Sequence, residues 1–259
     1  MNRRSILKAL FLGTSTAVPS VVKEQAVAGL KTDDMGISDK RWHVLSERNA
    51  MRELSPGNPE VNWQIENGRL TCMGHLPNAT AILSDYRLSG EDKSFQAEML
   101  FKFNDELIDQ AKHGLDVGFR FLSTGDISDA AQHIDAGLSR DGSLFIGRER
   151  GDRLLKEEIL KEQLRLALSV ITQSSGGCFA KLRAFDRSGN TLATLSSTKY
   201  SSSDWQGSIG VLSHFTGTNI YGQPSVVINN FKINGEKLVE FKLQDEPTDY
   251  ITQKNLNIG

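Results

Sequence analysis

The acidic residues of this sequence are poorly placed for acid–base catalysis. Two carboxylates that act as general acid and general base from one strand need even spacing, so that both side chains leave the same face. No strand-like segment shows this pattern, and Glu157-Glu158 are adjacent, so on a strand they would point to opposite faces. Three further acids fall in or near an irregular segment: Asp126, Asp129 and Asp135. The sequence therefore disfavours hydrolysis by a pair of carboxylates.

The histidines, serines and cysteines form no recognisable metal or nucleophile motif. The histidines are scattered singly, without the H-x-H or HExxH spacing of a zinc site. They are His43, His75, His113, His133 and His214. No serine lies in a G-x-S-x-G turn, and neither cysteine has a histidine neighbour in the pattern of a nucleophile. We therefore expect no zinc site and interpret each histidine as a surface or turn residue.

Two charged residues in strand-like segments are better candidates for hydrogen bonding to a ligand. In "DVGFRFL" the apolar residues alternate, so Arg120 points to the face opposite the core. In "HIDAGLS" the same alternation puts Asp135 on the side away from the core. Either the two residues form a cross-strand ion pair, or they contact a ligand.

The elements that must position these side chains are short strands joined by turns. "WQIENGRLTCMG" predicts a hairpin, with Asn67-Gly68 as a type I′ turn. "SFQAEMLFKF" alternates strictly, a second hairpin centres on Asp141-Gly142, and the last strand pair is closed by Asn234-Gly235. About ten or more such strands, with little helical periodicity, predict an all-β antiparallel sandwich of two sheets.

Two short helices are expected to interrupt the strands. One covers residues 105–113 after a cap at Asn104, and the other covers residues 126–132. The segment "GDRLLKEEILKEQLRL" favours helix by composition and strand by position. We interpret it as a strand, an irregular turn and a second strand.

The first 28 residues have the composition of an export signal. Arg3-Arg4 form a basic start, an apolar stretch covers residues 9–22, and small residues form an A-x-A pattern at residues 26–28. The run at residues 3–8 is similar to the twin-arginine export motif, and an ordinary secretory signal is the alternative. The apolar stretch is too short to span a bilayer, so we expect no permanent membrane anchor. A periplasmic or secreted protein is therefore expected.

Charge argues against nucleic acid as a partner. Cleavage after residue 28 would remove four basic residues and one acidic residue from a chain of net charge −2, leaving a net charge of −5. Neutralising phosphates requires a basic surface, and a mildly acidic exported protein does not provide one.

The two cysteines leave the disulfide question open at the level of sequence. Cys72 and Cys178 are far apart in the chain, and an oxidising compartment would permit a bond between them. Both lie in strand-like segments, where a free cysteine often serves as a small buried hydrophobe. A domain of this size does not need the bond.

Four segments resemble a known class of β-sandwich. They are "WQIENGRLTCMG", "GFRF", "AKLRAFDRSGNTLATLSS" and "GSIGVLSHF…VVINNFKINGEKL". Together they resemble concanavalin A-like jelly rolls, especially laminin G-like sandwiches and the family that includes 3-keto-disaccharide hydrolases. The resemblance covers residues 41–243 and implies an antiparallel two-sheet jelly roll with one or two short helices in loops. Residues 1–28 are then a signal peptide, 29–40 a linker and 244–259 a polar tail.

The resemblance also implies candidate ligand-binding residues. Members of these families bind or process carbohydrates on the concave sheet, which implies that Arg120 and Asp135 hydrogen-bond sugar hydroxyls. Trp205 and Tyr221 are candidates for an aromatic platform, with core capping as the alternative, and His214 completes the set. Because these residues are assigned to an exposed face, we expect Arg120→Ala to weaken sugar binding with little loss of stability.

No cofactor is expected, and calcium is the alternative. Some laminin G-like relatives hold calcium at a rim loop, and here Asp126 or Asp129 would be its ligands. Acidic loop residues are also found simply solvated.

The expected function is binding of carbohydrate or glycoconjugate by an exported, non-catalytic module. Two alternatives stay open: a glycoside or 3-keto-glycoside hydrolase that uses the concave face, and a structural docking domain of an exported phosphatase-type enzyme. A catalytic domain or protein is a candidate partner, because many members of these families are appended to one. Fold-level resemblance identifies architecture better than activity.

Overall fold

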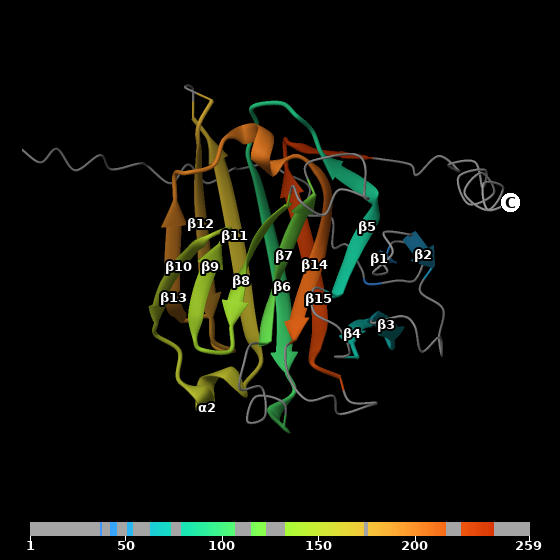
Figure 1. The fold of residues 1–259 in the computed structure, drawn as a ribbon, viewed down its shortest axis with the longest axis vertical. Coiled ribbons are helices and arrows are strands. Elements are labelled where there is room, and N and C mark those ends of the chain that lie inside the picture. The colour runs from blue at the N-terminus through green and yellow to red at the C-terminus, as the bar shows by residue number, and fades with distance from the viewer. Residues whose placement is uncertain are drawn as a thin grey trace, which may run out of the picture.

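The computed structural model describes residues 37, 42–45, 51–53, 63–73, 79–106, 115–122, 133–173, 176–215 and 224–240. Within these ranges the chain forms two antiparallel sheets (Figure 1). The expected all-β sandwich is therefore confirmed. The expected signal peptide, residues 1–28, and the tail, residues 244–259, lie outside the described ranges.

The larger sheet has nine strands and carries both Arg120 and Asp135. Eight strands follow the order β10, β9, β8, β7, β14, β5, β1, β2, and β16 pairs with β5. Their bounds are β10 (Glu149–Arg153), β9 (Ser143–Ile146), β8 (His133–Ser139), β7 (Leu115–Leu122), β14 (Gly207–Phe215), β5 (Ala79–Leu88), β1 (Trp42–Leu45), β2 (Met51–Glu53) and β16 (Leu238–Glu240).

The smaller sheet has seven strands, in the order β13, β12, β11, β6, β15, β4, β3. Their bounds are β13 (Thr191–Ser197), β12 (Cys178–Phe185), β11 (Leu164–Thr172), β6 (Phe95–Phe103), β15 (Val226–Gly235), β4 (Arg69–Cys72) and β3 (Trp63–Glu66). Among the described residues, the strands are interrupted by the short helix α2 (Glu157–Leu160) and by the 3-10 helix η1 (Ser202–Trp205).

Local turn chemistry explains both predicted hairpins. Asn67 and Gly68 join β3 to β4 with φ angles of 51° and 71°, as a type I′ turn requires. Gly142, between β8 and β9, has a φ of 83°, a conformation that glycine adopts without steric cost. The strict alternation of β6 is confirmed by its burial, because every second residue from Phe95 to Phe103 is buried. The turn after β15 differs from expectation, since that strand runs through Gly235.

Aromatic side chains from both sheets meet in one core. Phe95 on β6 lies 5.4 Å from Phe121 on β7, measured between ring centroids, and Phe119 on β7 lies 6.0 Å from Phe231 on β15. Trp42 on β1 meets the same Phe231 edge-on at 5.1 Å. Rings at these separations interlock the inner faces of stacked sheets. The core thus fixes which side of β7 faces inward.

The connection between β10 and β11 corrects part of the sequence interpretation. Both strands are present, but α2 occupies the segment that we expected to be an irregular turn. Helix-favouring Glu157 and Glu158 stand in its first turn, where negative charge is favourable, and Leu160 anchors it at 1% exposure. In this short segment the helix propensity of the residues therefore outweighed their position between two strands. Of the expected helix at residues 105–113, only Asp105 and Glu106 lie within the described ranges, and the backbone N–H of Glu106 donates to the capping Asn104 side chain. Residues 126–132 lie outside them.

Cys72 and Cys178 are both buried, and no disulfide bond joins them. Cys72 is on β4 and Cys178 on β12, with β15, β6 and β11 between them in the sheet. Four steps of about 4.8 Å put the two strands roughly 19 Å apart, far beyond the reach of a disulfide. The alternative role, that of a small buried hydrophobe, is the one that the structure shows.

Candidate functional site

The outer faces of the two sheets differ in their exposure to solvent. On the seven-stranded sheet, outward residues such as Gln96 and Lys102 are exposed, as is usual for an antiparallel sheet with one face in water. On the nine-stranded sheet, several outward residues are sheltered. Their exposed fractions are 1% for Ile82, 2% for Leu212, 4% for Phe145, 6% for Leu122 and 7% for Arg120. We call this side of the nine-stranded sheet the outer face, and it is the candidate site.

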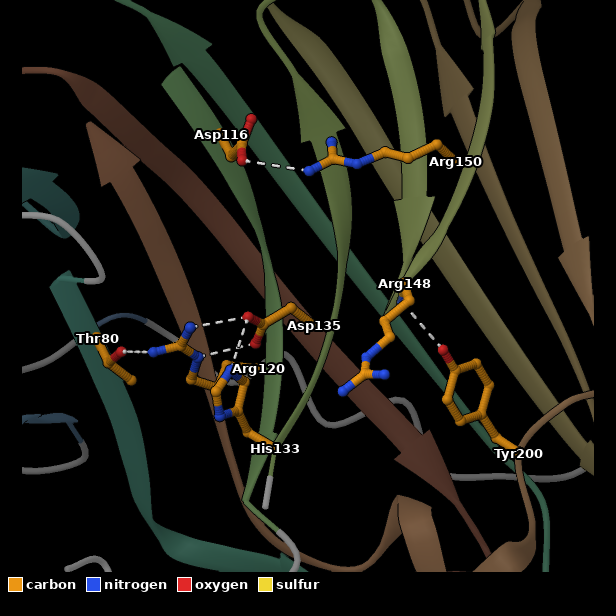
Figure 2. Close-up of polar contacts among 8 residues, drawn as sticks. All are labelled: Thr80, Asp116, Arg120, His133, Asp135, Arg148, Arg150 and Tyr200. Carbon is orange, nitrogen blue, oxygen red and sulfur yellow. Dashed lines mark hydrogen bonds and ion pairs between the residues drawn. The ribbon is translucent and has the colours of Figure 1, made fainter. Parts of the chain in front are cut away.

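Arg120 lies on the outer face, and its guanidinium donates three hydrogen bonds (Figure 2). Its Nε donates to Asp135 Oδ1 and its Nη2 to Asp135 Oδ2, both at 2.8 Å. Its Nη1 donates to Thr80 Oγ1 at 2.7 Å. The register of β7 and β8 places Arg120 directly opposite Asp135, which explains the two parallel bonds. The cross-strand ion pair that the sequence left open is therefore formed.

This ion pair is not a solvated surface pair. The side chains of Arg120 and Asp135 are 8% and 19% exposed. Exposed pairs contribute little, whereas a sheltered guanidinium needs most of its donors satisfied. The expectation that Arg120→Ala would cost little stability is therefore unsupported by its surroundings.

A glycine on the strand between β7 and β5 gives Arg120 its path to Thr80. Gly210 on β14 stands between Arg120 and Ile82 in the sheet register, and it presents no side chain on the outer face. A β-carbon there would lie 2.2 Å from the backbone oxygen of Ala81, so a larger residue would also disturb β5. Thr80 itself was not predicted from the sequence, because its place beside Arg120 follows from long-range pairing.

His133 extends the ion pair toward solvent. It lies two residues before Asp135 on the same strand, so both side chains share the outer face. Its Nε2 atom is 3.4 Å from Asp135 Oδ2, and its side chain is 33% exposed (Figure 2). His133 was interpreted as an isolated surface residue, and the i, i+2 spacing to Asp135 was the signal that could have grouped the two.

An aromatic ring lies over paired glycines beside this group. Gly118 on β7 faces Gly137 on β8, and Phe145 on β9 is the next residue across in the register. A β-carbon on Gly137 would lie 2.7 Å from Phe145 Cζ and 2.1 Å from a backbone oxygen of β7. The missing side chains thus allow the strands to approach closely and the ring to lie over the sheet.

A second charge pair, with a longer separation, lies beside Phe145. The guanidinium of Arg150, on β10, lies 4.8 Å from the centre of the Phe145 ring, which is a cation–π distance. Arg150 Nη2 is also 3.9 Å from Asp116 Oδ2 (Figure 2). The side chain of Arg150 is 52% exposed and that of Asp116 16% exposed. His214 on β14 is the register neighbour of Asp116 and is half-buried. His214 therefore lies on the outer face, on the strand next to the one that carries Asp116.

Trp205, by contrast, is not on the outer face. It ends η1 and is fully buried, with its ring 5.1 Å from Phe121 and 6.1 Å from Phe95. Its role as an aromatic platform is wrong, and the core role is correct. Tyr221 and the calcium candidates Asp126 and Asp129 lie outside the described ranges.

The arrangement offers donors and acceptors for hydroxyl groups, and the two carboxylates named on it are far apart. Of the five N–H groups of Arg120, two remain after its three bonds, and each Asp135 oxygen keeps acceptor capacity. The two carboxylates named on the outer face, Asp116 and Asp135, start from positions roughly 14 Å apart, given four residues along β7 and one strand step. Glycosidase carboxylates are separated by about 5–10 Å.

Among the described residues, no group of three or more His, Cys, Asp or Glu side chains is arranged to hold a metal ion. The described part of the chain also has no helix that is long and apolar enough to cross a membrane.

Comparison with family models and with curated proteins gives no match for this sequence. Solved structures do match. Arcelin-5, a lectin-like defence protein from Phaseolus vulgaris, has a TM-score of 0.51 at 12% identity, covering 68% of this chain and 90% of arcelin-5. Winged bean acidic lectin with methyl-α-D-galactose has a TM-score of 0.51 at 11% identity, covering 82% of this chain and all of the lectin. The lectin UEA-II with galactose has a TM-score of 0.51 at 10% identity, with coverages of 79% and 96%.

These similarities define the class of fold. Two antiparallel sheets with almost no helix in the described ranges, arranged similarly to those of these lectins, give the chain the fold of a concanavalin A-like jelly-roll sandwich. At identities this low the likeness concerns architecture alone.

Proposed function

We propose that this protein is an exported, non-catalytic module that binds carbohydrate or glycoconjugate on the outer face of its nine-stranded sheet. The observation that carries the proposal is the sheltered Arg120–Asp135 pair, held by Thr80 on a face that points away from the core. The finer assignment to laminin G-like or 3-keto-disaccharide hydrolase-type domains is part of the proposal and rests on the sequence motifs.

The composition of the outer face supports this reading. Binding sites for small polar ligands combine apolar walls with a few fixed polar groups. Here Ile82, Leu212 and Phe145 are buried apolar side chains of the same face, while Arg120 and Asp135 supply donors and acceptors in a fixed geometry. A bidentate pair with spare donors and acceptors matches neighbouring hydroxyls of a sugar ring, which both donate and accept. The solved lectins with bound galactose derivatives show that this architecture is compatible with such ligands.

Binding is favoured over hydrolysis by the contacts and the separation of the two carboxylates. Asp135 is bonded through both oxygens to Arg120, and Asp116 faces Arg150. Together with their wide separation, this makes the two acids unsuited to act as a catalytic pair.

The test is a glycan-array screen followed by calorimetric titration of the best ligand. Asp135→Asn keeps the shape of the side chain and removes its charge, so affinity should fall about tenfold or more. Glu98→Gln is the matched control, because Glu98 lies 3.6 Å from Arg165 on the outward side of the seven-stranded sheet. Equal losses in the two variants, or wild-type protein that binds no glycan, would contradict the proposal.

Export is supported by the first 28 residues and is tested separately. Arg3-Arg4, the apolar stretch and the A-x-A pattern predict cleavage after Ala28. N-terminal sequencing of protein recovered from the periplasm or the medium of an expressing bacterium should begin at residue 29. An intact N-terminus on cytoplasmic protein would refute export.

A further inference from the structure

Arg148 lies in the turn between β9 and β10, next to the Arg120–Asp135 pair. The residue before it, Gly147, donates its backbone N–H to the backbone oxygen of Asp135 at 2.7 Å. Arg148 is therefore one residue away from a backbone hydrogen bond to β8, the strand that carries Asp135. Its side chain is exposed and extends toward the side of the view where His133 lies (Figure 2).

The turn that carries Arg148 is fixed by a tyrosine. Tyr200 Oη accepts a hydrogen bond from the backbone N–H of Arg148 and donates one to the backbone oxygen of Ile146, both at 3.1 Å. Gly147 has a φ of 54°, and a β-carbon there would lie 1.9 Å from Tyr200 Oη. The ring of Tyr200 is itself held against buried Trp205, at 5.9 Å between centroids. Contacts with the core thus fix the position of the Arg148 backbone. Ligand binding therefore has no entropy cost for ordering this turn.

Unlike Arg120 and Arg150, Arg148 has a charge that the described residues leave uncompensated. Arg120 is paired with Asp135, and Arg150 faces Asp116. The acid next in sequence, Glu149, is held instead by Lys199 at 2.8 Å, and this hydrogen bond, with help from Ser197, keeps the pKa of Glu149 below its usual range. The described residues offer the Arg148 guanidinium no hydrogen bond or ion pair.

We propose that Arg148 forms an anion subsite at the edge of the outer face, so that the ligand is an acidic glycan carrying a carboxylate or a sulfate. The inference rests on the proposed carbohydrate-binding function and names its ligand class. A guanidinium matches planar or tetrahedral oxyanions with two parallel hydrogen bonds. The neutral part of the sugar would contact Arg120 and Asp135, while the anionic group reaches the turn.

The experiment compares ligands that differ only in charge. Trigalacturonate and its methyl ester test the carboxylate, and a chondroitin sulfate tetrasaccharide and its desulfated form test the sulfate, each by calorimetric titration at low and high salt. Wild-type protein should bind one acid at least tenfold more tightly than its uncharged or less charged counterpart, and this preference should shrink as salt rises. Arg148→Gln should abolish the preference and leave binding of the methyl ester unchanged.

The control is Arg187→Gln, which removes an exposed arginine from the turn between β12 and β13 in the other sheet. That variant should keep the full preference. Neutral glycans that bind as well as acidic ones, or a preference that survives Arg148→Gln, would overturn the inference and leave the proposed function standing. An array on which neither neutral nor acidic glycans bind would refute both. Because Arg148 is exposed, its variant should unfold at the wild-type urea concentration.

Discussion

The ion pair between Arg120 and Asp135 makes a quantitative prediction about stability. Arg120→Met removes two charged hydrogen bonds and the bond to Thr80, and leaves Asp135, 19% exposed, without its arginine partner. Breaking a buried pair by removing one partner costs about 3–5 kcal/mol, and partial access of water to Asp135 favours the lower end. We therefore expect a loss of about 3 kcal/mol.

The converse change should cost a similar amount. Asp135→Leu leaves a guanidinium of 8% exposure with only Thr80 as its partner, and we expect about 3 kcal/mol again. The double variant leaves neither charge unpaired, so it should cost no more than either single variant. The coupling energy of the pair is then at least about 3 kcal/mol.

Urea unfolding of the four proteins at neutral pH measures this coupling, provided that the slope of the transition is unchanged. The matched control is a second cycle on Arg165 and Glu98, whose side chains are 38% and 43% exposed. That pair should give a coupling below about 0.5 kcal/mol, and 1 M NaCl should weaken it while sparing the sheltered pair. A coupling below about 0.5 kcal/mol for Arg120 and Asp135 would show that the pair behaves as a solvated one, and our account of the site would fail.

Three further substitutions test other parts of the fold by the same urea assay. Lys237→Met should cost about 2–4 kcal/mol, because the 1% exposed ammonium group donates to three oxygens; a loss below about 1 kcal/mol would contradict this. Gly137→Ala puts a β-carbon 2.1 Å from a neighbouring backbone oxygen and should cost about 2–3 kcal/mol, whereas Gly151→Ala, with its nearest atom at 3.6 Å, should cost under about 1 kcal/mol. Burial acts to raise the pKa of Asp141, but hydrogen bonds from Ser143 and nearby arginines outweigh it, and the pKa is lowered. Asp141→Asn should therefore destabilise the protein above about pH 4 and match wild type once the pH falls below the lowered pKa; a deficit that persists at that pH would refute the assignment.

The orientation of Arg120 and Asp135 was predictable because it depends on neighbours in sequence. Strict alternation of apolar residues around each position fixes the face of a strand. The structure confirms that both side chains leave the core, and the register shows that they are opposite each other. Alternation does not predict which residues of other strands lie beside Arg120 and Asp135 on that face. The link to Thr80 depends on the pairing of β7, β14 and β5, which are distant in the chain.

Trp205 shows how a polar context can mislead. The residues "SSSDWQG" look like a solvent-exposed loop, which made an exposed aromatic platform plausible. In the structure, the backbone N–H and hydroxyl of Ser201 both donate to Asp204 Oδ2 at 2.7 Å. This capping arrangement starts the 3-10 helix η1 and turns the indole inward. An S-x-x-D pattern before an aromatic residue was the available signal for a cap.

Stability alone does not explain why a charged pair occupies the outer face. Replacing a buried ion pair with apolar residues of similar size is often neutral or stabilising, so selection for stability would not retain Arg120 and Asp135. The surrounding residues make that replacement easy to imagine, because Ile82 and Leu212 already give this face apolar character. A pair that fixes its own geometry while keeping two N–H groups and an accessible carboxylate edge is instead suited to recognition. If the double variant proves as stable as the wild-type protein but binds no glycan, the pair is maintained for its ligand.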